Sequence, residues 1–236
     1  MAAAPPEPAM TAAAGVEGAP GEVDEVAVAP SPALSFESRH GSATISLLPG
    51  PTCGRAGALA SAVDECIKRL SDVHVVILRV APGAAGGADG TAEDPGEAID
   101  QQVEQLQRLP QMMVGFVERP ASRGETCLVA ACDAVYAAPA ASFTVVERRG
   151  GSAVVSLPVL RALGGRLDPE CLASLGASSI DAPAALDLGL VSEVLEAPAL
   201  AARREDLVAQ LQASPAEAVA AQRTALRRRC AVAPAA

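Results

Sequence analysis

Apolar and polar positions alternate in the first regular stretch of the chain. Residues 33–49 (ALSFESRHGSATISLLP) alternate on both sides of His40 and Gly41, and this pattern predicts a β-hairpin with a tight turn. Residues 73–80 (VHVVILRV) form a nearly continuous apolar run, which is typical of a buried strand in a parallel sheet. Residues 112–117 (MMVGFV) predict another strand.

Between these strands, apolar residues recur at helical spacing. Residues 54–72 predict a helix with four apolar positions in register: Leu59, Val63, Ile67 and Leu70. Residues 99–109 predict a second helix, which Pro110 ends because proline has no backbone N–H. The apolar face of this second helix consists of Ile99, Val103, Leu106 and Leu109. A glycine-rich loop at 81–90 lies between the strand at 73–80 and this helix.

The later part of the chain continues this alternation. It predicts a helix at 124–133, strands at 134–139 and 141–146, a helix at 152–164 that Pro158 interrupts or delays, helices at 168–176 and 181–189, a strand at 190–196, and closing helices at 199–214 and 215–229. Asp168 and Asp181 are the expected N-caps of two of these helices. Repeated strand–helix–strand units with short connections predict an α/β fold with a largely parallel sheet.

Length and composition fit one folded domain. The 236 residues are half apolar but include only three Phe, one Tyr and no Trp, so Ala, Val, Leu and Ile must form the core. We expect residues 1–32, rich in Ala, Pro, Gly and Glu, to be a disordered leader, 33–230 to be the domain and 231–236 to be a flexible tail. The leader contains no basic residue, unlike a transit peptide.

Charge and cysteine content exclude several classes of protein. The net charge of −10 argues against nucleic acid as the main partner, although a few local Arg residues could still bind an anionic cofactor. No apolar run approaches the roughly 18 residues of a membrane span. The six Cys residues show no CxxC spacing and predict reduced thiols, and no metal site is expected because Asp89 has no second candidate ligand. Cytoplasm is the default compartment that remains.

Three blocks of the sequence carry a family pattern in their order and spacing. They are residues 73–90, which end in a GGADG loop, residues 109–147, which contain ASRGET and CD followed by ASFTVVE, and residues 178–195 (SSIDAPAALDLGLVSEVL). In these blocks the chain resembles the crotonase superfamily, the enoyl-CoA hydratases and isomerases, from about Phe36 to Arg229. The resemblance implies a spiral of ββα units with closing C-terminal helices, assembled as homotrimers or hexamers.

The resemblance also implies a chemistry for the ASRGET turn. In this family an acyl-CoA thioester becomes an enolate, and two backbone N–H groups hold its oxyanion; by the match these belong to Gly86 and Gly124. A helix N-terminus suits this role because its first N–H groups lack intrahelical acceptors and carry partial positive charge. Taken alone, Gly124 is better explained as an ordinary helix start and Gly86 as a loop glycine.

The acidic residues depart from the hydratase pattern. Cys127, expected to be a small buried apolar residue, stands where the hydratases carry a Glu, and Glu125 lies about 200° away around the helix, so it faces elsewhere. Glu147 stands where the family has its second Glu, although taken alone it is equally a surface salt-bridge partner. A hydratase needs two acids to activate water, whereas isomerases of this family move a proton with that single Glu. The pattern therefore favours an enoyl-CoA isomerase.

No separate cofactor is implied, because coenzyme A is part of the substrate. Arg223 and Arg227 are candidate contacts of its phosphates, and the alternative for residues 227–229 is a solvated helix end that complements the helix dipole. Three other functions stay open: a hydratase or another crotonase reaction, an enzyme acting on carrier-protein thioesters in polyketide-type synthesis, and a non-catalytic binding or assembly protein. Arg119, Arg123 and Glu125, in a normally glycine-rich turn, favour the last.

Overall fold

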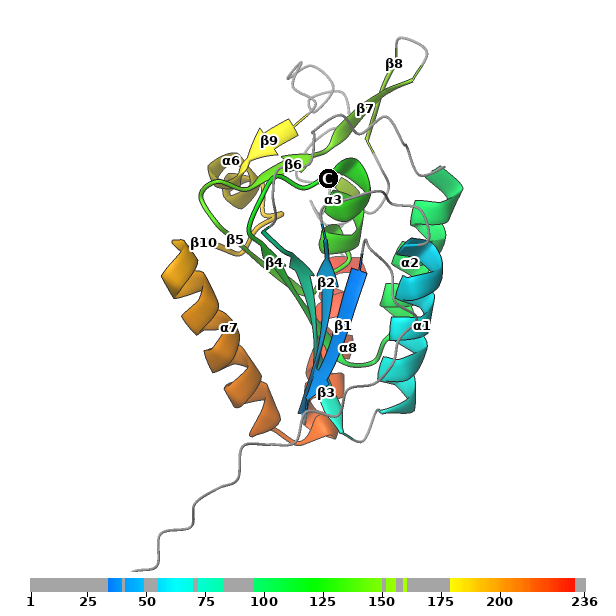
Figure 1. Ribbon diagram of the computed structural model, residues 1–236, viewed down its shortest axis with the longest axis vertical. Coiled ribbons are helices and arrows are strands. Elements are labelled where there is room, and N and C mark those ends of the chain that lie inside the picture. Colours follow the sequence, from blue (N-terminus) through cyan, green and yellow to red (C-terminus); the bar gives the residue numbers. More distant parts are fainter. Residues whose placement is uncertain are drawn as a thin grey trace, which may run out of the picture.

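A six-stranded sheet forms the centre of the computed structural model, which describes residues 34–39, 41–48, 55–69, 72–82, 96–149, 152–155, 159–160 and 179–231 (Figure 1). The strands, in spatial order, are β1 (Leu34–Arg39), β2 (Gly41–Leu47), β3 (Val73–Val80), β4 (Met112–Val117), β5 (Ala134–Ala137) and β10 (Glu193–Val194). β1 and β2 are antiparallel, and the other neighbouring strands are parallel. The predicted α/β fold with a largely parallel sheet is confirmed.

The predicted hairpin at the edge of this sheet is also confirmed. Gly41 has φ 83°, in the left-handed region that glycine adopts without steric cost. Its N–H donates to the carbonyl of Asp72 (2.7 Å), which joins the turn to the start of β3. A Cβ at Gly41 would lie 2.3 Å from the side chain of Gln212. The backbone conformation therefore favours glycine at this turn, whereas the exposed Gln212 side chain could move aside.

Three helices contribute to the main core on one side of the sheet: α1 (Arg55–Lys68), α2 (Gly96–Arg108) and α3 (Arg123–Ala130). The predicted apolar face of α2 is confirmed, since all four of its residues are buried. In α1 the prediction was right for Leu59 and Val63, but Ile67 is exposed. Steps of four residues drift by about 40° around a helix, so Cys66 completes the buried face in its place.

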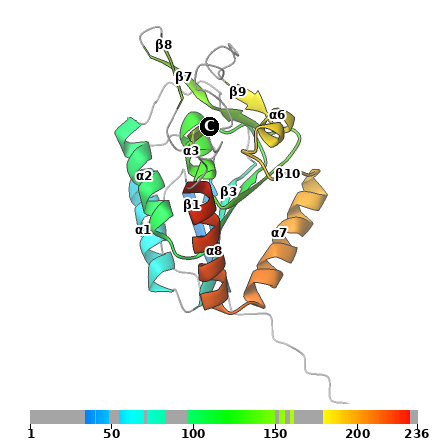
Figure 2. The same ribbon diagram turned by 180° about the vertical axis from the view of Figure 1, so that it is seen from behind.

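The opposite face of the sheet packs against α7 (Ala197–Gln212), as Figures 1 and 2 show from two sides. Side chains alternate between the two faces along each strand. Phe116 of β4 packs in the cluster with Leu200 of α7, whereas Val117 belongs to the main core. α8 (Ala216–Ala231) contacts β3 and β4 and lies in front in Figure 2. The two predicted closing helices are therefore confirmed.

Short elements lie at the end of the molecule where the parallel strands finish (Figure 1). β6 (Ser142–Thr144) pairs with β9 (Ser179–Asp181), and β7 (Val146–Arg149) pairs with β8 (Ser152–Val155), both antiparallel. α6 (Ala182–Asp187) begins at the predicted N-cap, because the Asp181 carboxylate accepts a hydrogen bond from Ala184 N (2.9 Å). The helix predicted at 168–176, with Asp168 as its N-cap, lies outside the described residues.

The helix predicted at 152–164 was wrong over its first residues. Ser152–Val155 form strand β8, in which Val154 and Val155 stand opposite Glu147 and Val146 of β7. β-branched residues fit a paired strand well, and cross-strand pairing of this kind overrides a local apolar period. Of the rest of that segment, the described residues 159–160 are helical.

The outer limits of the predicted domain lie at the margins of the described chain. The predicted leader, residues 1–32, is outside the described residues, and so are residues 232–236 of the predicted tail. Both segments therefore stay predictions, although α8 continues to Ala231. None of the described helices combines the length and apolarity needed to cross a bilayer.

Candidate functional site

The carboxyl ends of β2, β3 and β4 meet the N-terminus of α3 at one edge of the sheet (Figure 1). Ligands of parallel α/β sheets characteristically bind outside the carboxyl ends of the strands. β6 is joined to the turn before α3, because Ala121 N donates to Ser142 O (2.8 Å) and Thr144 N donates to Ala121 O (3.3 Å). The start of α3 and the segment after β5 are thereby held together.

A capping box fixes the start of α3. The hydroxyl of Ser122 accepts a hydrogen bond from Glu125 N (3.4 Å), and the Glu125 carboxylate accepts one from Ser122 N (2.9 Å). Gly124 is the second helical residue, so its N–H is among those without an intrahelical acceptor. A Cβ at Gly124 would make only an ordinary contact with Ile99 (3.5 Å), so packing within the described chain does not require glycine there.

A buried ion pair lies beside this turn. Arg119 donates through Nη2 to Glu125 Oε1 (2.8 Å) and through Nη1 to Glu125 Oε2 (3.0 Å). The two side chains are 18% and 3% exposed. Sequence reasoning noted both residues as departures from a glycine-rich turn but did not predict their pairing, because two residues six positions apart across a turn follow no helical or strand period.

The acid and the thiol of α3, Glu125 and Cys127, both have structural surroundings that argue against a role as a general base. The prediction that Cys127 is a small buried residue is confirmed, since its side chain is 1% exposed and its thiol is not part of a disulfide. Both carboxylate oxygens of Glu125 accept hydrogen bonds, from Arg119 and from Ser122 N. The first turns of α3 thus offer backbone N–H groups, while the one carboxylate there is already engaged.

The other residues predicted for the reaction are described only in part. Glu147 lies in β7 opposite Val154, and its side chain is outside the described part. Its strand follows β6 directly, so the Glu147 backbone and the N-terminus of α3 lie at the same end of the molecule (Figures 1 and 2). The predicted second oxyanion donor, Gly86, lies outside the described residues.

Arg223, a predicted phosphate contact, lies inside the fold. Its side chain is 2% exposed, and its Nε lies 2.8 Å from Oδ2 of Asp133, which is 4% exposed. The same carboxylate oxygen accepts a hydrogen bond from Met113 N (2.8 Å), so the pair ties α8 to the start of β4. This placement favours a structural role for Arg223. Arg227 belongs to α8, but its side chain is outside the described part.

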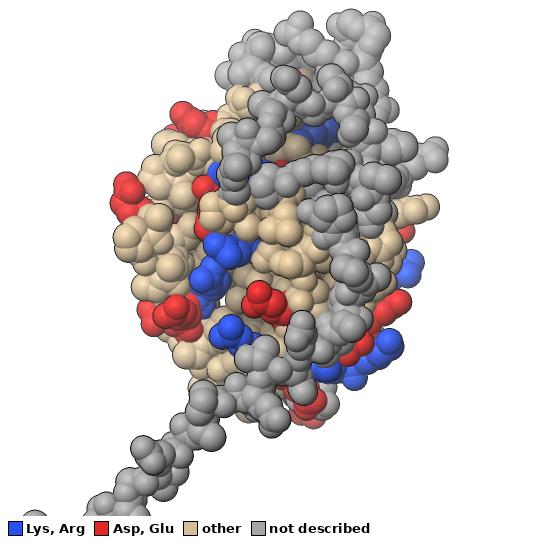
Figure 3. Space-filling view, viewed as in Figure 1, with Lys and Arg blue, Asp and Glu red and all other residues tan. Residues whose placement is uncertain are grey.

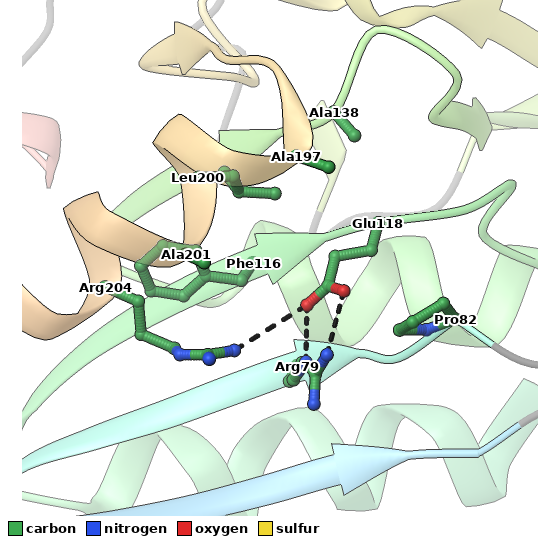
Figure 4. Close-up of a pocket in the computed structure, with 9 residues that line it drawn as sticks. All are labelled: Arg79, Pro82, Phe116, Glu118, Ala138, Ala197, Leu200, Ala201 and Arg204. Atoms are coloured by element: carbon green, nitrogen blue, oxygen red, sulfur yellow. Dashed lines mark hydrogen bonds and ion pairs between the residues drawn. The ribbon is translucent and has the colours of Figure 1, made fainter.

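A small pocket lies on the α7 side of the same strand ends (Figure 4). It has a volume of about 190 Å³, and Phe116 and Leu200 are among its apolar lining residues. The Glu118 carboxylate lies between two guanidinium groups: it is hydrogen-bonded to Arg79 (Nη2 to Oε2, 2.8 Å) and lies 3.8 Å from Nη1 of Arg204. The hydrogen bond to Glu118 raises the pKa of Arg79.

Charge on this face of the molecule is mixed. In Figure 3 basic side chains gather near the middle of the visible part of the face, and acidic side chains lie around them. Among the described residues of this face, basic and acidic side chains are therefore interspersed. Among the described residues, no group of three His, Cys, Asp or Glu side chains is placed to hold a metal ion.

Comparisons with known proteins agree with this architecture. The family model for enoyl-CoA hydratase/isomerase matches residues 72–235. No curated protein matches the sequence. An enoyl-CoA hydratase/isomerase family protein from Silicibacter pomeroyi has a similar solved structure, with 27% identity and a TM-score of 0.67 over 84% of this chain and 90% of that chain.

Two further solved structures share the fold. An enoyl-CoA hydratase from Mycobacterium smegmatis is 24% identical, with a TM-score of 0.66 over 84% of each chain. An enoyl-CoA hydratase/isomerase from Acinetobacter baumannii is 21% identical, with a TM-score of 0.66 over 86% of this chain and 93% of that chain. The family model covers most of the chain and the solved structures repeat its fold, so this chain belongs to the enoyl-CoA hydratase/isomerase family of enzymes, the crotonase superfamily.

Proposed function

We propose that this protein is an acyl-thioester enzyme of the enoyl-CoA isomerase type. Gly86 and Gly124 donate backbone N–H groups to the thioester oxyanion, and Glu147 takes a proton from one carbon and returns it to another. The observation that carries this proposal is that Glu125, the one acid at the start of α3, is held in an ion pair and cannot readily serve as a second catalytic acid. Glu125 is paired with Arg119, and the hydratase acid position holds the buried Cys127.

The chemistry follows from this inventory. Removing a proton beside the thioester carbonyl places negative charge on the carbonyl oxygen, where two preorganised N–H donors and the α3 dipole stabilise it. A double-bond shift needs one base that accepts the proton at one position and delivers it at another. Addition of water needs a second acid to orient the attacking water, and Glu125 is occupied. Coenzyme A enters as part of the substrate, and no step requires a metal or redox group.

A non-catalytic acyl-thioester binding protein is the second candidate. The specific observation in its favour is the ion pair of Arg119 and Glu125, two charged side chains in a turn that is glycine-rich elsewhere in the family. Such a protein would bind coenzyme A derivatives without turnover. A phosphopantetheine thioester on a carrier protein is the alternative substrate for either candidate, and we propose a homotrimeric or hexameric assembly in the cytoplasm.

The test is conversion of a 3-enoyl-CoA into the conjugated 2-enoyl-CoA. Chromatography with ultraviolet detection measures the product. We expect turnover by the wild type and a loss of about 10²–10⁴-fold in Glu147→Gln, the usual contribution of a positioned general base. Glu205→Gln, an exposed carboxylate of α7, is the matched control and should retain activity. Turnover that survives in Glu147→Gln would contradict the single-base mechanism, and coenzyme A binding without turnover by the wild type would favour the binding protein.

A further inference from the structure

The end of β4 sends two consecutive charged side chains to opposite faces of the sheet. Glu118 joins the α7 side with Arg79, and Arg119 joins the α3 side with Glu125. Both residues follow β4 directly, and their divergence continues the alternation of side chains along that strand. The Arg119 side chain therefore lies in the layer that holds the proposed oxyanion site, directly below the first turn of α3.

The Arg119 guanidinium contacts several of the described chain segments that converge at this end of the sheet. Its Nε donates to the carbonyl of Ala81, just after β3 (2.8 Å), and its Nη1 donates to Pro120 O (2.8 Å). Its Nη2 reaches the carbonyl of Leu47 at the end of β2 (3.4 Å). Glu125 accepts from the same guanidinium and belongs to the first turn of α3. One side chain thus links the ends of β2 and β3 to the start of α3.

The first turn of α3 carries Gly124, the one proposed oxyanion donor among the described residues, so its placement bears directly on the proposed site. The chain beyond Ala81 leads toward the loop that holds Gly86, and Gly124 lies one residue before Glu125. A rigid, planar guanidinium with several simultaneous charge-assisted bonds fixes both distance and angle, which an apolar side chain of similar size does not. Burying an ion pair is also costly compared with packing apolar residues, so stability alone is a poor reason for it.

We propose that Arg119 and Glu125 are positioning residues that hold the first turn of α3, and with it the N–H of Gly124, against the ends of β2 and β3. The pair stands where family members have glycines, so it is a feature of this chain's own site. Its effect passes through the placement of Gly124, without contact to the substrate. The kinetic effect expected from this inference rests on the proposed function. The effect expected on the position of Gly124 rests only on the geometry of α3.

The test compares Arg119→Met and Arg119→Lys with Arg79→Met. The last variant removes the corresponding hydrogen-bonded pair on the α7 side of the same strand end and is the matched control. In steady-state turnover of a 3-enoyl-CoA, we expect kcat of Arg119→Met to fall by about 10²-fold with KM changed little, because a misplaced donor weakens the transition state more than substrate binding. Arg119→Lys should recover part of this loss, and Arg79→Met should retain the wild-type kcat.

A second measurement keeps this inference separate from the isomerase proposal. In ¹⁵N-labelled protein, the backbone amide resonance of Gly124 and its rate of hydrogen exchange should change in Arg119→Met and in Glu125→Gln but not in Arg79→Met. These changes in the Gly124 amide are expected even if no substrate is turned over. In that case the isomerase proposal fails, and the positioning role stands. An unchanged Gly124 amide, or kcat retained in a folded Arg119→Met protein, would overturn the positioning role. Should Arg119→Met fail to fold, Arg119→Lys provides the same readouts.

Discussion

The two ion pairs at the end of β4 use the same chemistry in different surroundings. Arg119 and Glu125, on the α3 side, are 18% and 3% exposed, whereas Arg79 and Glu118, on the α7 side, are 29% and 19% exposed. The first guanidinium also donates to backbone carbonyls from three segments. The second shares its carboxylate with Arg204 in an open pocket. We therefore expect burial and extra backbone contacts, rather than charge itself, to decide how much each pair contributes to stability.

The most deeply buried pair provides the largest test of this comparison. Arg223→Met should lower the free energy of unfolding by about 3–5 kcal/mol, because it leaves the carboxylate of Asp133 buried without its cation. Urea denaturation followed by circular dichroism measures this loss. Arg108→Met, at an exposed position of α2, is the control and should change stability little. A loss below about 1 kcal/mol in Arg223→Met would show that burial does not set the strength of these pairs.

The next largest difference is expected between the two carboxylates at the end of β4. Glu125→Gln should lower the free energy of unfolding by about 3 kcal/mol, because it leaves Arg119 poorly compensated and weakens the capping box. Glu118→Gln should cost at most about 1 kcal/mol, because solvent partly screens this more exposed pair. Both variants are compared by urea denaturation at low and at high salt. Equal losses, or a stronger salt effect on Glu125→Gln, would reverse the comparison.

The smallest expected effect on stability comes from the buried thiol of Cys66, which is not part of an ion pair. Burial against the main core, helped by nearby Glu65, raises the pKa of the Cys66 thiol to about 12. The folded state then holds this proton more tightly than the unfolded state. The contribution of the thiol to folding stability is therefore fully present below about pH 9 and is lost as the pH rises toward 12.

Thiol labelling and alkaline unfolding check this expectation. Cys66 should resist alkylation at pH 8 in the folded protein and react fully in urea, as mass spectrometry of the labelled peptide would record. Cys66→Ala should show a smaller loss of stability between pH 8 and pH 10.5 than the wild type. Rapid labelling of the folded protein at pH 8 would contradict the buried, protonated thiol.

Local sequence patterns predicted most of the regular elements. The apolar run at 73–80 and the four-residue apolar face of α2 each reflect one element packing on one layer, and both were confirmed. Gly41 could be located because a tight turn requires a backbone that only glycine adopts easily. Strand β8 was missed because its pairing with β7 outweighs the local pattern.

By itself, the sequence determined the fold class and the family, since both depend on residue type and spacing along the chain. The tertiary structure alone decided which charges meet. Arg119 and Glu125 join across a turn, and Asp133 and Arg223 join a strand connection to the last helix. Such pairs form between positions with no fixed spacing, because the layers that bury them come together only when the sheet and helices pack. The first pair holds the start of α3 and the second ties α8 to β4, and the sequence pattern predicted neither pairing.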